Sequence, residues 1–286
     1  MNWFEALIIG LVQGISEFLP ISSSAHLLIV EKLLGISYQD PTLTLEVWLH
    51  FSSLLAVIVY FRKELLALIK NAWDYLYKRN VKGKNDFRFI ILLLISTVIT
   101  FIVGKMLEST LGEGLTSFSL IAVALIITGI FLIFIEHGGF QERKERGDIS
   151  YKDAIWIGIA QAIAIIPGIS RAGSTLVGAM MLGLKKEEAL RYSFLLSIPI
   201  ISGLTLLKLT SISTLYDTNS ISLTFAFISS FLFALVGIRW LISMVRNTKL
   251  SYFAIYCIVL GIFVWFFYGH EPVSLAMPVA QTLISG

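Results

Sequence analysis

The stretch Glu17-Phe18-Leu19-Pro20-Ile21-Ser22-Ser23-Ser24 divides an otherwise apolar segment, residues 2–35, into two arms. The arms have about 16 and 14 residues, and each is too short to cross a membrane core of ~30 Å at ~1.5 Å per residue. Residues 152–184 repeat the pattern, with Pro167-Gly168-Ile169-Ser170-Arg171 between arms of about 15 and 13 residues. We therefore predict two re-entrant helical hairpins.

The composition places the rest of the chain in a membrane as well. Its 286 residues are 56% hydrophobic and only 14% charged, and the mean hydropathy is +0.83. A water-soluble domain has a charged share of about a quarter. Six further stretches are apolar enough to span a bilayer, at 47–62, 87–107, 116–136, 189–209, 220–244 and 250–269. We expect an all-α polytopic membrane protein with six transmembrane helices plus the two hairpins.

The basic residues predict the orientation of these spans. If residue 47 starts at the outer face, 18 of the 22 Lys and Arg residues fall in inner connections or at inner helix ends, as the positive-inside rule requires. We therefore predict a multi-pass plasma-membrane protein. The net charge of +3 comes from these connections, so no nucleic-acid surface is predicted. The single cysteine, Cys257, excludes an internal disulfide, and no Cys/His spacing indicates a zinc site.

The layout predicts an inverted repeat. The first repeat, 1–136, contains the hairpin 2–35 and three spans, and a cytoplasmic linker, 137–151, leads to the second repeat. That repeat, 152–270, contains the hairpin 152–184 and three spans, and a tail, 271–286, follows. Broken helices in inverted repeats commonly meet near the midplane of the membrane, so the two tips should face each other there. Residues 63–80 predict an amphipathic helix on the cytoplasmic surface.

The second tip has the composition of an anion site. Arg171 is the one basic residue away from the aqueous edges, and it precedes a short helical arm. The positive end of a helix dipole, free backbone N–H groups and a guanidinium can together hold a phosphate. The residues that we expect around such a group are Gly168, Ser170, Gly173, Ser174 and Thr175. Alternatively, the tip is a glycine-serine helix breaker closed by an Arg–Glu pair.

The first tip offers a complementary set. Glu17 is an acid with apolar sequence on both sides, which makes it a functional candidate, although it could also serve only to tie the hairpins together. His26 follows Ser23 by three residues, a spacing that puts an imidazole near a hydroxyl nucleophile. Ser22 is another candidate for substrate binding. The serines are equally well explained as helix caps.

Three more polar residues belong to this set of candidates. Gln13 lies one helical turn before Glu17 and either positions water, a metal or Glu17, or satisfies its own hydrogen bonds inside the hairpin. Glu46 and His50 share a helix face, and either point into the same cavity or form an ordinary solvated helix end.

At these residues the chain resembles the undecaprenyl-diphosphate phosphatase family, integral-membrane enzymes associated with bacitracin resistance. The family's first signature, Glu or Gln followed four residues later by Glu, corresponds to Gln13 and Glu17. Its second signature, Pro-Gly-x-Ser-Arg-Ser-x-x-Thr, corresponds to residues 167–175. Two positions depart from the common pattern: Gln13 is an amide where many members have a carboxylate, and Ala172 replaces the second serine.

The resemblance implies hydrolysis of undecaprenyl diphosphate to the monophosphate and inorganic phosphate, with the active site open to the outer face. It further implies a divalent cation, Mg²⁺ or Ca²⁺, held by Glu17, with Ser23 as the nucleophile and Arg171 as the phosphate clamp. His26 would act as a base, and the resemblance also suggests a homodimer. The alternative function is a polyprenyl-phosphate transporter or flippase, which would need the anion site but no nucleophile.

Overall fold

A computed structural model describes residues 1–286 except 37–41, 112–116, 141–142, 248–249 and 270–286. His270 and the predicted tail, 271–286, lie outside the described residues. The described residues form helices and no strand. The α-helices are α1 (Trp3–Phe18), α2 (Ser23–Leu33), α3 (Thr42–Tyr60), α4 (Arg62–Lys78), α5 (Lys84–Leu111), α6 (Phe118–His137), α7 (Tyr151–Ala162), α8 (Arg171–Met181), α9 (Lys186–Leu207), α10 (Leu209–Asn247) and α11 (Ser251–Tyr268).

Several of these helices are long and apolar enough to cross a membrane, so the protein is a multi-pass membrane protein. In the described part of the chain the criterion is met by five segments, Val81–Thr110, Phe118–His137, Lys186–Leu207, Ser220–Val245 and Ser251–Tyr268. They correspond to five of the six predicted spans. The sixth prediction, 47–62, falls on α3, whose apolar part, Leu45–Tyr60, is shorter.

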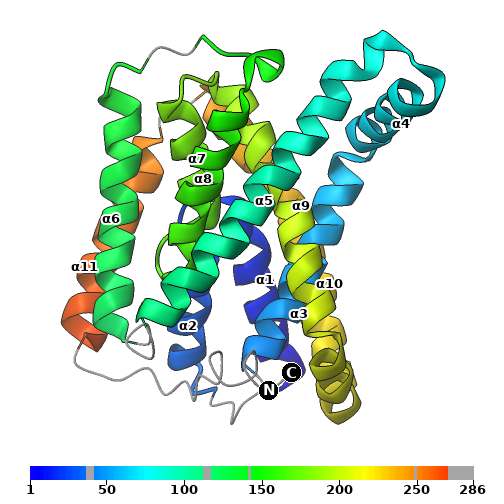
Figure 1. The fold of residues 1–286 in the computed structure, drawn as a ribbon. Coiled ribbons are helices and arrows are strands. Elements are labelled where there is room, and N and C mark those ends of the chain that lie inside the picture. The colour runs from blue at the N-terminus through cyan, green and yellow to red at the C-terminus, as the bar shows by residue number, and fades with distance from the viewer. Residues whose placement is uncertain (37–41, 112–116, 141–142, 248–249, 270–286) are drawn as a thin grey trace.

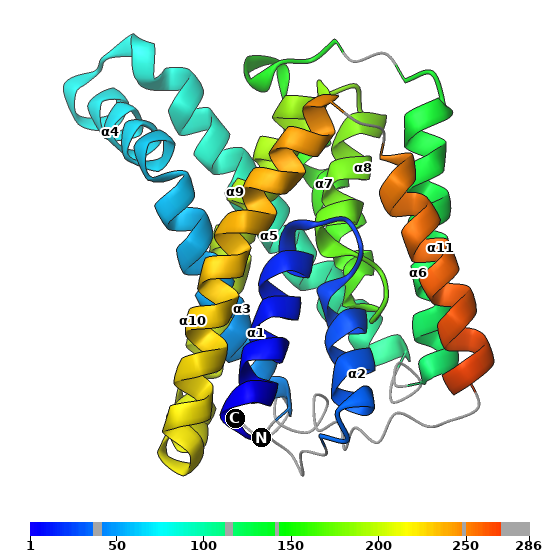
Figure 2. The same cartoon turned by 180° about the vertical axis from the view of Figure 1, so that it is seen from behind.

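The two interrupted segments fold as helical hairpins whose turns lie inside the helix bundle. Figure 1 and Figure 2 show α1 and α2 reaching into the bundle from one end, while α7 and α8 reach in from the opposite end. The predicted segments 2–35 and 152–184 therefore form helical hairpins, and their re-entrant placement in a membrane stays a prediction. Their opposite directions bring the two turns toward each other.

Local sequence explains where the hairpin arms begin and end. Asn2 caps α1 and forms a reciprocal capping box with Glu5. Ser150 and Asp153 form the same box at the start of α7. Pro20 disfavours helical geometry at the preceding residue, and α1 accordingly ends at Phe18. Pro20 thus ends α1 before this arm could span a membrane.

Glycines allow α1 to pack very closely against α10. A Cβ on Gly10 would lie 2.3 Å from the carbonyl oxygen of Ala226, and a Cβ on Gly14 would lie 2.4 Å from that of Ser230. Small residues spaced four apart are the usual means of close helix approach in membranes, where dispersion and hydrogen bonding drive association. This interface fixes the first hairpin against the second half of the chain.

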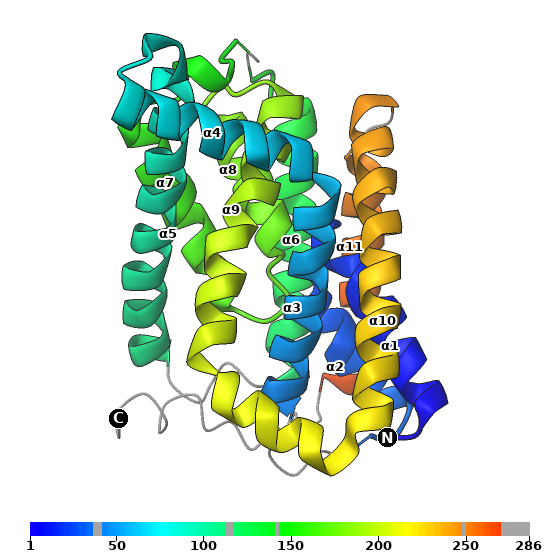
Figure 3. The same cartoon turned by 90° about the vertical axis from the view of Figure 1, so that its right-hand side faces the viewer.

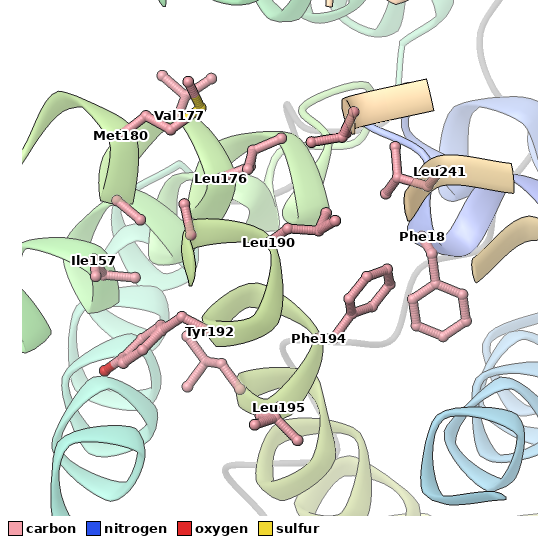
Figure 4. Packing of buried hydrophobic residues seen from close by; sticks show 14 of the residues in the cluster. Phe18, Ile157, Leu176, Val177, Met180, Leu190, Tyr192, Phe194, Leu195 and Leu241 are labelled. Carbon is pink, nitrogen blue, oxygen red and sulfur yellow. The ribbon is translucent and has the colours of Figure 1, made fainter. Parts of the chain in front are cut away.

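The main apolar cluster continues from the first hairpin into helices of the second half of the chain. Figure 4 shows Phe18, at the end of α1, beside Phe194 of α9 and Leu241 of α10. The rings of Phe18 and Phe194 are 5.4 Å apart, and both residues are buried. This packing supports the inner end of α1 next to Glu17.

The predicted amphipathic segment, 63–80, is helical over Arg62–Lys78 as α4. Figure 3 shows α4 lying across one end of the bundle. Leu66, Ile69 and Trp73 are exposed on it, so an apolar stripe is left uncovered by the described part of the chain. We interpret α4 as a structural helix at the membrane surface.

Candidate active site

The two hairpin turns are joined directly at their tips. The guanidinium of Arg171 donates a hydrogen bond to Oε1 of Glu17 in a partly buried ion pair, although 154 residues separate them. The Ser170 hydroxyl donates to the Leu19 carbonyl at 3.5 Å. The structure thus brings together Glu17, the candidate acidic residue of one hairpin, and Arg171, the candidate basic residue of the other.

Ser23 points toward the same carboxylate. Its hydroxyl donates to Oε2 of Glu17 at 2.8 Å. The preceding residue, Ser22, has a φ of +69°, a left-handed conformation that costs a non-glycine residue about 1 kcal/mol or more. This sharp turn starts α2 and directs its first residue back toward the end of α1. A strained backbone at such a place is typical of functional sites.

Gln13 and His50 complete the surroundings of Glu17. Gln13 Nε2 donates to Oε2 of Glu17 at 2.8 Å and lies 2.6 Å from His50 Nδ1. His50 Nδ1 is itself 3.2 Å from Oε2 of Glu17. His50 therefore belongs to the polar cluster around Glu17 rather than to a solvated helix end. The other amide atom, Gln13 Oε1, is buried and has no hydrogen-bond partner.

The second tip is held in shape by α6. Thr128 of α6 donates from its hydroxyl to the Gly168 carbonyl at 3.1 Å, and the Ser170 N–H donates to the same hydroxyl at 3.4 Å. Gly168 has a φ of +99°, and a Cβ there would lie 2.7 Å from Ala124 Cβ and from the Ile121 carbonyl oxygen. Only glycine fits this position without strain.

The remaining candidates lie at the start of α8. Ser170 is its N-cap and accepts from the Gly173 N–H at 3.0 Å, so the helix begins where the sequence predicts an anion site. A Cβ on Gly173 would lie 3.0 Å from Ser170 Cβ and in ordinary contact, at 3.4 Å, with Pro20 Cβ of the first tip. Ser174 is half-buried in the first turn of α8. Thr175 is fully buried, and its hydroxyl is taken up by contacts within the protein. It lies 2.5 Å from the Ser193 hydroxyl and donates to the Arg171 carbonyl at 3.0 Å.

His26 does not bond to Ser23 in this arrangement. Its Nδ1 lies 2.7 Å from the Ser22 carbonyl oxygen, and its Nε2 lies 2.7 Å from the hydroxyl of Tyr256 in α11. The spacing of Ser23 and His26 predicts a shared helix face, but it does not identify the partners of each side chain. Sequence reasoning missed Tyr256, whose only signal is a hydroxyl inside an apolar span.

The site is therefore a junction of two hairpins in which a hydroxyl, a carboxylate and a guanidinium meet. Comparison with known proteins adds to this geometry. Residues 6–263 match the model of the family described as "Bacitracin resistance protein BacA". The chain belongs to the BacA family. The family resemblance predicted from the two signatures is confirmed, since the match covers both hairpins and all five long apolar segments in whole or in part.

Individual BacA-family relatives match over most of their length. "Undecaprenyl-diphosphatase 2" of Halalkalibacterium halodurans is 44% identical over 274 residues, which cover 95% of this chain and 98% of the relative. "Undecaprenyl-diphosphatase 1" of Shouchella clausii is 41% identical over 270 residues, covering 93% and 97%. "Undecaprenyl-diphosphatase" of Oceanobacillus iheyensis is 37% identical over 278 residues, covering 93% and 100%.

Proposed function

We propose that this protein hydrolyses undecaprenyl diphosphate to undecaprenyl phosphate and inorganic phosphate, which recycles the lipid carrier for cell-wall polymers. The names of the relatives support this activity. The observation that carries it is the contact of Glu17 with both the Ser23 hydroxyl and the Arg171 guanidinium. A nucleophile and a phosphate-binding cation thereby converge at one buried point.

The chemistry assigned to these groups follows from the demands of phosphoryl transfer, which needs positioning and charge neutralisation more than covalent participation. Ser23 is the proposed nucleophile, and its hydroxyl is already oriented by Glu17. A guanidinium has five N–H donors, so Arg171 can contact Glu17 and still offer donors to a phosphate. The start of α8 adds backbone N–H groups and a positive dipole end.

Some of the other candidates are proposed to contact the diphosphate, and the rest are proposed to hold the backbone around it in place. Gln13, Ser22, Ser170 and Ser174 offer polar groups around the proposed diphosphate position, while Gly168 permits the close approach of the second tip to α6 and Gly173 lies beside Ser170. Thr175 supports the Arg171 backbone through its hydrogen bond. His26 is proposed to activate the water that hydrolyses the phosphoserine.

The oxygen atoms beside Glu17 suit a divalent cation, Mg²⁺ or Ca²⁺. The unpartnered Gln13 Oε1 and the Glu17 carboxylate are oxygen donors of the kind these hard cations bind. No group of three or more metal-binding His, Cys, Asp or Glu side chains occurs among the residues that the structure describes. Mg²⁺ usually needs only one or two carboxylates besides substrate phosphates and water. When bound, the cation would neutralise diphosphate charge.

The membrane arrangement is part of the proposal. Six spans with two oppositely inserted re-entrant hairpins, related as an inverted repeat, would place the hairpin junction inside the bilayer. The orientation of the spans rests on the distribution of Lys and Arg, and the opening of the site to the outer side rests on the family resemblance. The polyprenyl tail would remain in lipid while the diphosphate reaches the tips. A homodimer stays a prediction.

The test is phosphate release from undecaprenyl diphosphate by the purified protein in detergent, with Mg²⁺ or Ca²⁺ and with a chelator. We expect turnover only with a cation. We expect Ser23→Ala to abolish turnover with an unchanged melting temperature, and Arg171→Ala to abolish it with a lower melting temperature, because Glu17 then loses its ion-pair partner. Ser109→Ala is the matched control, because it removes an exposed hydroxyl that bonds only within α5. Full turnover by both site variants would refute the assignment.

The same experiment addresses a polyprenyl-phosphate transporter. A transporter needs the anion contacts of Arg171 but has no use for a serine nucleophile. If the wild-type protein releases no phosphate yet moves lipid phosphate across vesicles, and Ser23→Ala moves it equally well, the phosphatase proposal fails. The relatives quoted above carry diphosphatase names, so no observation favours the transporter.

A further inference from the structure

His26 is held between two hydrogen-bond partners from opposite ends of the chain. Its Nδ1 lies 2.7 Å from the Ser22 carbonyl oxygen in the same helical turn, and its Nε2 lies 2.7 Å from the Tyr256 hydroxyl, 230 residues away. The two rings also stack, with centroids 5.6 Å apart and planes only 15° from parallel. Tyr256 thus fixes the imidazole by its hydroxyl and by its ring.

These two contacts define the tautomer of His26. A carbonyl oxygen only accepts hydrogen bonds, so the hydrogen of a neutral His26 must be on Nδ1. Nε2 then carries the lone pair, and the Tyr256 hydroxyl donates to it. Any proton that His26 takes up must therefore arrive at Nε2, the nitrogen that Tyr256 covers.

We propose that Tyr256 is a positioning residue for His26, which holds the imidazole in the Nδ1–H tautomer with Nε2 ready to accept a proton. The proposal rests on the function proposed above, in which His26 activates water. Tyr256 lies on the last described helix, so this contact would link the second repeat to the nucleophile hairpin. The residue acts through His26 and is not assigned a contact with substrate.

A phenol hydroxyl suits both states of the imidazole. An incoming water replaces the Tyr256 hydroxyl at the single lone pair of Nε2 and gives it a proton. The oxygen of that water keeps the electron pair and attacks phosphorus, and the P–O bond to Ser23 breaks. The tyrosine hydroxyl then turns and accepts a hydrogen bond from the new Nε2–H, because a hydroxyl can donate or accept. The Ser23 oxygen finally takes up the proton that Nε2 releases. Phenylalanine would keep the ring stack but leave Nε2 without this partner.

Packing alone does not account for Tyr256. Its side chain is 45% exposed, whereas the next residue, Cys257, is fully buried and lies 3.7 Å from the Pro20 carbonyl oxygen of the first tip. Cys257 therefore packs α11 against the first hairpin, and the Tyr256 side chain extends from this contact toward His26. Figure 2 shows α11 passing beside the hairpin of α1 and α2. Tyr252, one turn earlier, is 62% exposed and provides a matched control.

The first measurement needs no enzymatic activity. The chain has four histidines, so ¹⁵N-histidine labelling gives a short imidazole spectrum in which His26 is assigned by its loss in His26→Gln. We expect His26 as the Nδ1–H tautomer, and we expect Tyr256→Phe to shift its Nε2 resonance more than Tyr252→Phe does. An Nε2–H tautomer in the wild-type protein, or equal shifts in the two variants, would overturn the proposal.

The second measurement is the kinetics of phosphate release. Loss of one well-placed hydrogen bond predicts a kcat about tenfold lower in Tyr256→Phe, with KM within about twofold of wild type and an unchanged melting temperature. Tyr252→Phe should match wild type. A variant that loses melting temperature and raises KM without lowering kcat would show a merely structural residue. If the wild-type protein is inactive, the proposed function fails. The imidazole spectrum still shows whether Tyr256 donates a hydrogen bond to Nε2 of His26.

Discussion

Glu17 and Arg171 form an ion pair across the tips of the two hairpins, so each hairpin depends on the other to satisfy a charge in the interior of the bundle. Glu17 is 5% exposed, and the Arg171 side chain is itself half-buried. Removing one partner of a buried pair leaves an uncompensated charge, which typically costs about 3–5 kcal/mol. The pair therefore links folding of the site to its proposed chemistry.

Arg171→Lys should lose most of the activity although it keeps the charge. A lysine ammonium is a point charge without the planar fork that serves two oxygen acceptors at once. We expect it to satisfy either Glu17 or the phosphate, and phosphate release to fall by about 100-fold. Initial rates with undecaprenyl diphosphate measure the effect. Wild-type turnover in the lysine variant would mean that the fork geometry has no role.

Glu17→Gln should lower turnover more than Gln13→Ala does. Glu17 contacts Ser23, Arg171, Gln13 and His50, and its carboxylate is the proposed cation ligand. Gln13 contributes an amide whose oxygen has no partner within the protein. We expect a loss of about 100-fold or more for the first variant and about tenfold for the second. Titrations with Mg²⁺ or Ca²⁺ measure both, and equal small losses would contradict this ranking.

The hairpins were predictable because the length of each apolar arm and the composition of the turn between the arms determine them. Arms of this kind cannot cross a bilayer, and the prolines and serines that interrupt them mark the turns. The ion pair of Glu17 and Arg171 was one of the open interpretations, because two lone interior charges of opposite sign have few other ways to be satisfied.

The partners of His26 were not predictable from spacing. A helix places Ser23 and His26 on one face, but a side chain can also bond to the backbone carbonyl of the residue four positions earlier. His26 does so with Ser22, and its other nitrogen bonds to Tyr256, a residue from the opposite end of the chain. Such a contact is fixed by the packing of α11, which no local pattern encodes.

Gly14→Ala should destabilise the protein by separating α1 from α10. The added Cβ would lie 2.4 Å from the Ser230 carbonyl oxygen, so one helix has to move, at a cost of about 1–3 kcal/mol. Gly104→Ala in α5 is the control, since no neighbouring atom lies within 4 Å of its Cβ position. Melting in detergent should shift down by several degrees only for Gly14→Ala. Equal melting temperatures would show that α10 yields without cost.

Ala172→Ser should leave turnover similar to wild type or raise it by a few fold. Ala172 is in the first turn of α8, where a serine hydroxyl would add a donor near the proposed phosphate position. The substitution restores the residue that the family signature has here. Phosphate release at saturating substrate measures it. A collapse of activity with normal melting would show that the site is adapted to alanine.

Cysteine labelling should show that each hairpin begins and ends on one side of the membrane. Exposed arm ends are available in both hairpins: Trp3 and Leu33 in the first, Tyr151 and Met181 in the second. Each is replaced by cysteine in a Cys257→Ala background and treated with a membrane-impermeant maleimide. We expect the first two to react from outside intact cells and the last two only in inside-out vesicles, because 18 of the 22 basic residues lie on the predicted inner side. If position 3 and position 33 react from opposite sides, α1 and α2 together cross the bilayer. The hairpin tip would then no longer be a place where two half-helices meet, and the shared site of Glu17 and Arg171 would lose its structural basis.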